Sequence, residues 1–354
     1  MNRRNAAFTL VELMIAMAIV TLVLYAAINF FIISVRQYNV QTKIIETNVE
    51  GILGLELFRQ DLESLGFGLP WNSLGNYTEK TGNGSALNDG NNIAPRAVVS
   101  INGATFTWNN SDYLGIKSAR VGMSDAAGKW TTLTQANVTR TWTPASENLV
   151  GTDYVIVLSL GSTAANRRSL VAAGNFYTLF TTAGTAGFVP LEPYSANIVY
   201  GIDNVIPVRP FNRADYYIDN SARPLHCAQN TGVLVKAVVA HDASGTTPTL
   251  MPLLDCVADM QVVYGLDNNA DGTVDGWSED ISAGMTAADI RAQLAEIHVH
   301  ILAQEGQRDD SYTSPSATIP VGSEGFGNNF DVSGYRNYRW KVYNIVMRPK
   351  NLAN

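Results

Sequence analysis

One uninterrupted apolar run near the N-terminus constrains this chain more than any other feature. It covers residues 8–35, contains neither proline nor glycine, and carries a single charge, on Glu12. As an α-helix, these 28 residues would be about 42 Å long, which exceeds the ~30 Å hydrocarbon core of a bilayer. Arg3 and Arg4 precede the run, and a basic start of this kind faces the cytoplasm. The pattern therefore predicts a single membrane-spanning helix over residues 8–35.

Two small residues indicate where the chain would be processed. A secretory signal carries small residues after its apolar stretch, so that cleavage removes that stretch. Here Ala6 and Ala7 come before it. Cleavage between Ala7 and Phe8 would leave the apolar segment on the mature protein and would create a free amine on Phe8.

Glu12 is the unusual residue of the apolar run. A carboxylate costs about 2.5–3.5 kcal/mol to place in a membrane, and such residues usually have a function or a paired partner. The new amine of Phe8 is one candidate partner. In the alternative interpretation, Glu12 lies at the headgroup level and benefits from the positive end of the helix dipole.

The segment 3–13, with the sequence RRNAAFTLVEL, resembles the leader and FTLxE box of type IV prepilins and type II secretion pseudopilins. In that family a prepilin peptidase cuts before the Phe, the new N-terminus is methylated, and the Glu neutralises the N-terminus of a neighbouring subunit. The resemblance implies a leader at residues 1–7, cleavage between Ala7 and Phe8, N-methylation of Phe8, and an intersubunit contact made by Glu12. The family usually has Gly before the cut, where this chain has Ala7, and we expect processing to survive that change.

The helical pattern continues beyond the apolar run as an amphipathic segment, residues 36–66. Apolar residues recur there at steps of three and four, which places them on one helical face. They are Ile45, Val49, Ile52, Leu55, Phe58, Leu62 and Leu65. Gly51 and Gly54 weaken the helix and are candidates for a bend. We predict one helix over residues 8–65, whose first half lies in lipid or in a filament core and whose second half covers a globular sheet.

The remaining segment, residues 67–354, is predicted to be a β-rich globular domain in the periplasm or outside the cell. Apolar or alternating runs separated by Gly, Asn and Pro predict strands at residues 96–101, 112–121, 153–160, 232–241, 256–266, 297–303 and 338–347. A short helix is predicted at residues 286–295 with Thr286 as its cap. The fold class is therefore α+β, with one long helix packed on a mostly antiparallel head. An alternative divides the head into two lobes near residues 207–224.

Three segments of the head are similar to PilW-family minor pilins, which are related to the J-type minor pseudopilin of type II secretion. They are residues 56–62, 112–119 and 259–265. This resemblance implies a type IV pilin fold and a scarce subunit at or near the filament tip. It also implies an inner-membrane position with a periplasmic head before assembly, and as partners the prepilin peptidase, other minor pilins, the major pilin and an inner-membrane assembly platform. The alternatives are a minor pseudopilin of a secretion system, and a tip adhesin or DNA-binding pilin.

An Asp-rich loop matches the pattern D-x-[DN]-x-[DN]-G, which places oxygen ligands at alternate positions as calcium requires. The candidate ligands are Asp267, Asn269, Asp271, the Thr273 carbonyl and Asp275. The pattern is incomplete, because Ser278 stands where the bidentate Glu is expected. A hairpin turn favours the same residue types and is the alternative.

Cys227 and Cys256 are the two cysteines of the chain. In an oxidising periplasm an isolated pair usually forms a disulfide, and two buried thiols are the alternative. His298 and His300, two residues apart on a predicted strand, share one face and are interpreted as ordinary strand residues.

The sequence gives no sign of catalysis or of nucleic-acid binding as a main activity. No nucleophile, phosphate-loop or metalloprotease motif occurs, so we expect no enzyme. The net charge of −7 provides no positive field for a phosphate backbone. The basic and aromatic residues at 336–350 could stack single-stranded DNA, but a sheet edge protected by cations is the favoured interpretation.

Overall fold

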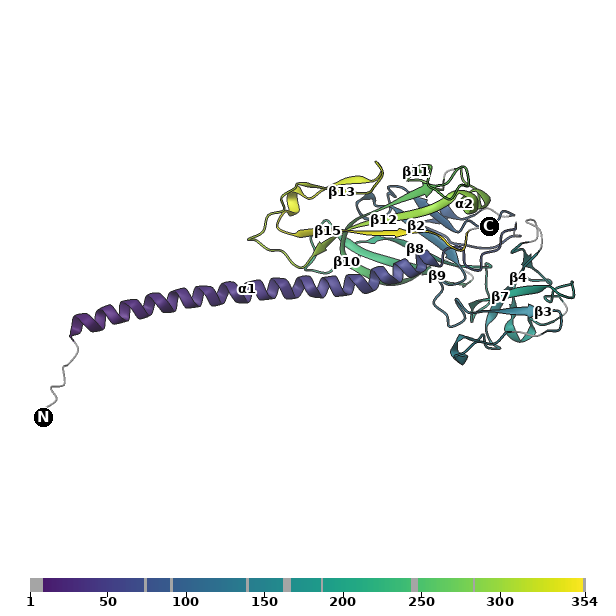
Figure 1. The fold of residues 1–354 in the computed structure, drawn as a ribbon, viewed down its shortest axis with the longest axis horizontal. Coiled ribbons are helices and arrows are strands. Elements are labelled where there is room, and N and C mark those ends of the chain that lie inside the picture. Colours follow the sequence, from purple (N-terminus) through teal and green to yellow (C-terminus); the bar gives the residue numbers. More distant parts are fainter. Residues whose placement is uncertain are drawn as a thin grey trace, which may run out of the picture.

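A long helix projects from a β-rich head in the computed structural model (Figure 1). The structure describes residues 9–72, 75–89, 92–137, 140–161, 167–185, 187–242, 248–282 and 284–352. Helix α1 (Leu10–Glu63) has 54 residues, and Thr9 caps its start. At 1.5 Å per residue it is about 80 Å long. The prediction of one long N-terminal helix is confirmed, although its predicted first residue, Phe8, lies outside the described residues.

The main body of the head is an eight-stranded antiparallel sheet, which confirms the α+β class. Its strand order is β1-β2-β8-β9-β10-β12-β15, and β11 also pairs with β10. The strands are β1 (Val98–Ile101), β2 (Tyr113–Ser118), β8 (Asn212–Asp219), β9 (Gly232–Val239), β10 (Thr249–Leu266), β11 (Gly276–Ser278), β12 (Leu294–Glu305) and β15 (Arg339–Met347). In the central pair, Val262 of β10 lies opposite Val299 of β12.

A second, five-stranded sheet is inserted in the chain between β2 and β8. It contains β3 (Trp130–Thr134), β4 (Tyr154–Ser159), β5 (Leu170–Val171), β6 (Thr178–Leu179) and β7 (Ala196–Asp203). This sheet lies at the end of the head farthest from the N-terminus (Figure 1). The chain passes from the five-stranded to the eight-stranded sheet between Asp203 and Asn212. The predicted lobe boundary at residues 207–224 overlaps this connection but also includes β8, which pairs with both β2 and β9. Prolines 207, 210 and 224 flank β8 rather than interrupt it.

Short elements complete the head. Hairpin β13 (Thr318–Val321) and β14 (Asn328–Asp331) packs on the eight-stranded sheet. Helix α2 (Ala287–Gln293) begins at a capping box formed by Thr286 and Asp289, which confirms the predicted helix. The 3-10 turns are η1 (Ser85–Leu87), η2 (Trp108–Asn110), η3 (Ala145–Glu147), η4 (Phe180–Thr182) and η5 (Ser333–Tyr335).

The C-terminal third of α1 packs on the sheet and forms part of the largest core cluster. Phe58, Leu62 and Leu65 are fully buried there, as their spacing predicts. Gly54 is required by this packing, because a Cβ at that position would lie 1.6 Å from the Leu253 carbonyl oxygen. The glycine therefore permits close approach of the helix to β10.

The middle of α1 presents a different face to the head from the one predicted. Thr47 accepts a hydrogen bond from the Gly306 N–H at 3.1 Å, and the Tyr343 hydroxyl lies 3.2 Å from Asn48 Oδ1. With these polar residues facing the head, four apolar side chains of the helix point away from the sheet. We call these four residues the exposed stripe; with their exposed fractions, they are Ile45 (62%), Val49 (55%), Ile52 (63%) and Leu53 (67%). The prediction that Ile45, Val49 and Ile52 cover the sheet is wrong.

Candidate functional site

The N-terminal end of α1 carries the candidate assembly residue, Glu12. Its Oε2 accepts hydrogen bonds from the Thr9 N–H and the Thr9 hydroxyl, both at 2.9 Å. The Glu12 N–H in turn donates to Thr9 Oγ1 at 3.3 Å. This capping box holds the exposed carboxylate at the very start of the helix. The intersubunit contact of Glu12 stays a prediction, and so do cleavage and methylation, because Ala7 and Phe8 lie outside the described residues.

The first half of α1 is an uncovered apolar surface. Every large apolar side chain described between residues 10 and 33 is more than half exposed. This helix is the one candidate membrane span among the described residues. An apolar surface of this extent is stable only when lipid or other helices cover it.

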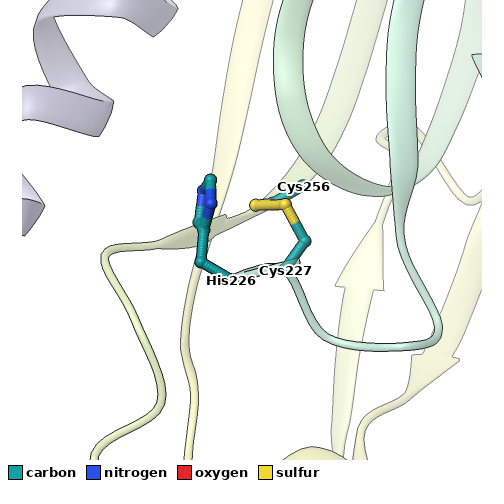
Figure 2. Close-up of side chains that lie close together, drawn as sticks. All are labelled: His226, Cys227 and Cys256. Carbon is teal, nitrogen blue, oxygen red and sulfur yellow. A yellow bond between two sulfur atoms is a disulfide. The ribbon is translucent and has the colours of Figure 1, made fainter. Parts of the chain in front are cut away.

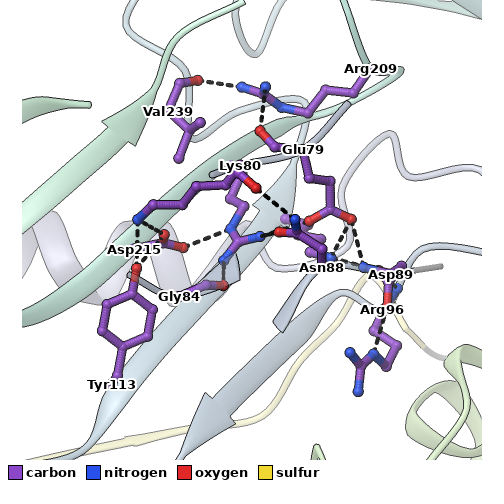
Figure 3. A network of polar contacts seen from close by, with 12 residues as sticks. Glu79, Lys80, Gly84, Asn88, Asp89, Arg96, Tyr113, Arg209, Asp215 and Val239 are labelled. Atoms are coloured by element: carbon purple, nitrogen blue, oxygen red, sulfur yellow. Dashed lines mark hydrogen bonds and ion pairs between the residues drawn. The ribbon is translucent and has the colours of Figure 1, made fainter. Parts of the chain in front are cut away.

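A buried charge network joins the loop at residues 75–89 to the eight-stranded sheet (Figure 3). We use this name for the side chains of Glu79, Lys80, Asp89, Arg96, Lys117, Arg209, Arg213 and Asp215. Lys117 Nζ lies 2.8 Å from Glu79 Oε1 and 2.5 Å from Asp89 Oδ2. Asp215 pairs with Lys80 at 2.6 Å and with Arg213 at 2.8 Å. The network therefore ties β2 and β8 to a loop that has no regular strand pairing of its own.

The network contains five cations and three carboxylates, so its formal charge is positive. Burial opposes the ionisation of Asp215, but the charges of Arg213 and Lys80 hold its pKa below the usual value. Burial lowers the pKa of Arg209 to about 10, although Glu79 favours the charged form. Arg209 also donates to the backbone carbonyls of Glu79 and Ala240. These donated bonds offset part of the cost of burying a guanidinium.

Sequence patterns did not reveal this network. Arg213 and Asp215 alternate along β8, and such charges on a strand usually face solvent. Their partner Glu79 lies more than a hundred residues earlier in the chain. The signal that could have indicated it is Lys117, a cation that directly follows the apolar stretch Leu114–Ile116 in a predicted strand.

Cys227 and Cys256 form a disulfide, as predicted (Figure 2). The bond connects the loop before β9 to the bulged part of β10, where Cys256 has a positive φ of 55°. The nearby His226 and the two sulfurs form the one group of three or more His, Cys, Asp or Glu ligand atoms that lie within 4.8 Å of one another in the described chain. Because both sulfurs are in the disulfide, no thiolate is present to hold a metal.

The Asp-rich loop folds around its own carboxylates. Asp267 accepts hydrogen bonds from the Ala270 N–H at 2.7 Å and the Gly272 N–H at 2.8 Å. Asp271 accepts from the Thr273 hydroxyl and from the Thr273 N–H at 2.8 Å, and these hydrogen bonds lower the pKa of its carboxyl group. The loop is thus ordered by hydrogen bonds typical of a turn.

Calcium binding by this loop stays a prediction. The predicted ligands Asp267, Asn269, Asp271, Thr273 and Asp275 are neighbours in one loop, and oxygen donors suit a hard cation. The three carboxylates are not among the described groups whose ligand atoms all lie within 4.8 Å of one another. Binding would therefore require the loop to exchange some of its own hydrogen bonds for the ion.

Strand β15 lies at an edge of the eight-stranded sheet, and its cations are paired with acids. The pairs are Arg339 with Asp309, Lys341 with Glu305, and Arg348 with Glu296. The interpretation as an edge protected by cations is confirmed. On the neighbouring strand, His298 contacts Glu296 at 3.0 Å and His300 contacts Asn344 at 2.7 Å.

Two families match the chain at its two ends. Residues 2–28 match the prokaryotic N-terminal methylation motif. Residues 215–351 match type IV pilus-assembly protein W, the PilW family. The chain carries a PilW-family domain behind a prepilin methylation motif, and both support a type IV pilin-like protein. No curated protein and no solved structure gives a significant match.

The PilW-family match covers most of the eight-stranded sheet of this pilin and leaves the five-stranded sheet outside it. The methylation motif implies processing by a prepilin peptidase and assembly with other pilins. Together with the apolar half of α1, it is consistent with membrane anchoring and incorporation into a pilus. Pilin-family domains are structural.

Proposed function

We propose that this protein is a minor pilin that takes part in starting the assembly of a type IV pilus, at or near the filament tip. A prepilin peptidase removes residues 1–7 and Phe8 is methylated. The subunit waits in the inner membrane with its head in the periplasm. Helix α1 then leaves the lipid and packs among the helices of other minor pilins and the major pilin, on an inner-membrane assembly platform.

The exposed stripe is the observation that carries this proposal. Residues 10–33 already provide about 36 Å of apolar helix, enough to cross the ~30 Å core of a bilayer. Ile45 begins about 18 Å farther along the axis, so lipid tails cannot cover it when residues 10–33 span the membrane. More than half of its surface is nevertheless exposed. A single-span anchor has no use for this second apolar surface, whereas neighbouring helices of a filament would bury it.

Glu12 supplies the register of that packing. Its carboxylate lies at the exposed start of the helix, where the methylated amine of a neighbouring Phe8 is the complementary charge. A subunit packed out of register leaves this charge unpaired in an apolar surrounding, which is costly. Pairing therefore selects one axial position for each incoming subunit.

The shape of the head supports a position at or near the tip. The five-stranded sheet lies beyond the C-terminal end of α1 (Figure 1). In a filament whose subunits stack along their helices, this is the space that the next head would occupy. The additional sheet would clash with a head stacked above it, so this subunit fits best at the tip, where no subunit lies above.

Assembly in cells tests the proposal through Glu12→Ala, with Glu46→Ala as the control. Glu46 is an exposed acid on the same helix that pairs with Lys43, outside the apolar run. We expect both variants to be processed to the same mature mass, and Glu12→Ala alone to reduce incorporation into sheared filaments. Normal piliation in Glu12→Ala would refute the role of Glu12. Normal piliation in a deletion strain that has lost protein secretion would instead assign the chain to a secretion pseudopilus.

The exposed stripe is tested separately by Ile52→Lys. Ile52 is 63% exposed, so a lysine there leaves the core of the head intact. We expect normal membrane insertion and normal processing together with poor incorporation into filaments. Full incorporation would show that the stripe has no helix partner.

A further inference from the structure

Neutral amides make up most of the lining of a groove on the head. It has a volume of about 450 Å³ and lies between turn η2, the start of β9 and strand β14. Five asparagines line it: Asn109, Asn110, Asn230, Asn328 and Asn329. Sites for small molecules are about 300–1,000 Å³ in volume, so the groove is large enough for a ligand.

One of these amides has no hydrogen-bond partner among the described residues. Both side-chain polar atoms of Asn230 are buried and lack a hydrogen bond within the described part of the chain. An unpaired buried amide costs free energy, and a native protein rarely keeps one without a reason. Asn230 also lines the groove, so a small shift of its side chain would let a ligand bound there supply the missing hydrogen bonds.

The backbone around the groove is also strained. Asn109 and Asn110 both have positive φ values, 56° and 52°. The Asn109 amide nitrogen donates to the carbonyls of Asn230 at 2.8 Å and Ala258 at 2.7 Å, which fixes turn η2 against the sheet. Left-handed backbone at non-glycine residues is uncommon and is concentrated at functional sites. Here it presents two adjacent amides on one wall of the groove.

The charge of the lining excludes ionic ligands. No lysine or arginine lines the groove, so a phosphate or carboxylate would have no counter-ion. One carboxylate lines it, that of Asp331, and this side chain already accepts a hydrogen bond from the Ser333 N–H at 2.7 Å. A divalent cation requires more negative oxygen ligands than that.

Tyr335 adds a flat apolar surface to the amides. It lies in turn η5, where its N–H donates to the Val332 carbonyl and its carbonyl accepts from the Trp340 indole N–H at 3.2 Å. These hydrogen bonds fix the backbone that carries the ring. An amide offers both donors and an acceptor, as a row of sugar hydroxyl groups does, and an aromatic face packs on the C–H face of a pyranose ring. These two elements together match a neutral carbohydrate.

We infer that this groove binds a neutral glycan of one or two sugar units. The hairpin β13–β14 that forms one wall packs on Ala258 and Leu302, in a core cluster separate from the one that contacts α1. Figure 1 places β13 and α1 on opposite sides of the head. The groove therefore stays accessible when α1 packs into a filament, and it gives the head an adhesive function beyond assembly.

Ligand-observed NMR on the full-length protein tests this inference. The protein is held in an amine-oxide detergent, since detergents with sugar headgroups would compete for the groove. The probes are lactose, maltose, cellobiose, chitobiose and mannobiose, with sialic acid as a charged comparison. We expect saturation transfer to at least one neutral disaccharide, and binding about tenfold weaker in Tyr335→Ala and Asn329→Ala.

Control variants separate loss of the site from loss of the fold. Tyr335→Phe keeps the ring and should keep binding. Tyr194→Ala removes a fully exposed aromatic ring from a loop outside the groove and should bind as the unchanged protein does. No transfer to any neutral sugar overturns the inference, and so does binding that survives both Tyr335→Ala and Asn329→Ala. Filament incorporation should be normal in Tyr335→Ala. Glycan binding and the assembly role of Glu12 can therefore be refuted independently of each other.

Discussion

Asp215→Asn should destabilise the head more than Lys117→Met, although each change removes one charge from the buried charge network. The network has two more cations than carboxylates, so removal of an acid raises its excess charge and removal of a cation lowers it. Asp215 accepts from Arg213, from Lys80 and from the Tyr113 hydroxyl. Its neutralisation leaves Lys80 buried without a carboxylate partner.

The magnitudes follow from the partners that remain. Loss of one member of a buried ion pair typically costs about 3–5 kcal/mol, and we expect Asp215→Asn to fall in this range. After Lys117→Met, Glu79 keeps Arg213 at 2.7 Å and Asp89 keeps Arg96 at 2.6 Å. Each acid therefore retains a cation, and we expect a cost of about 1–3 kcal/mol, as for hydrogen bonds to charged groups.

Urea unfolding of the full-length protein in detergent micelles measures the difference, with tryptophan fluorescence as the signal. A gap of ~2 kcal/mol between the variants corresponds to about 0.7 M urea for a slope of ~3 kcal/mol/M. Asp219→Asn, an acid on the same strand whose described bonds are to exposed Ser221, is the control and should change stability by less than about 0.5 kcal/mol. Equal midpoints for the two network variants, or the reverse order, would refute the reasoning from charge excess.

Acidic pH should reduce the difference in the free energy of unfolding between Asp215→Asn and the unchanged protein. Because the pKa of Asp215 is lower in the folded protein than in the unfolded chain, its contribution is present above the unfolded value. It is lost as the pH falls through the folded value, below about pH 4. The unfolding curves of Asp215→Asn and of the unchanged protein should therefore lie closer together at pH 3 than at pH 7. The same separation at both pH values would contradict this linkage.

Three further perturbations test other parts of the head. Replacing Cys227 and Cys256 together by Ser should lower the free energy of unfolding by about 3.5 kcal/mol, because the bond closes a loop with a separation of 29 residues; an unchanged urea midpoint would contradict this. Burial raises the pKa of Asp259 to about 6, so its contribution to the stability of the head should fall as the pH rises from about 4 to 6, and Asp259→Asn should reduce that loss and be more stable at pH 8. Parallel stability curves for the two proteins would disprove it. Calorimetry should detect calcium binding that Asp271→Ala abolishes, and the absence of heat in the unchanged protein would remove the calcium prediction.

The sequence predicts those parts of the fold in which a hydrophobic pattern is compatible with only one kind of secondary structure. Each of the seven predicted strands corresponds to an observed strand, because apolar alternation and flanking turns suffice for strands that face the core. Strand β8 was not predicted, since its sequence NRADYYID carries Arg213 and Asp215 in buried positions. Strands β5 and β6 have two residues each, too few for any periodicity.

The candidate sites follow the same division. The disulfide could be predicted because two cysteines allow one pairing. The groove could not, because its asparagines come from turn η2, the start of β9 and strand β14. Asn is also a common turn residue, and Asn109, Asn230 and Asn329 look like three unrelated turns until the sheet brings them together.

The face that α1 turns toward the head says more about its function than the periodicity of its apolar residues. A step of three and four residues shows that a helix has an apolar face, but it does not show which neighbour covers that face. In this pilin, Thr47 and Asn48 make the contacts with the head, and Ile45 and Val49 are left for another partner. A helix that serves only to hold its own head would gain stability from the opposite arrangement, with the apolar residues inward. The retained exposure is therefore best explained by a second packing surface, which a filament provides and an isolated subunit does not.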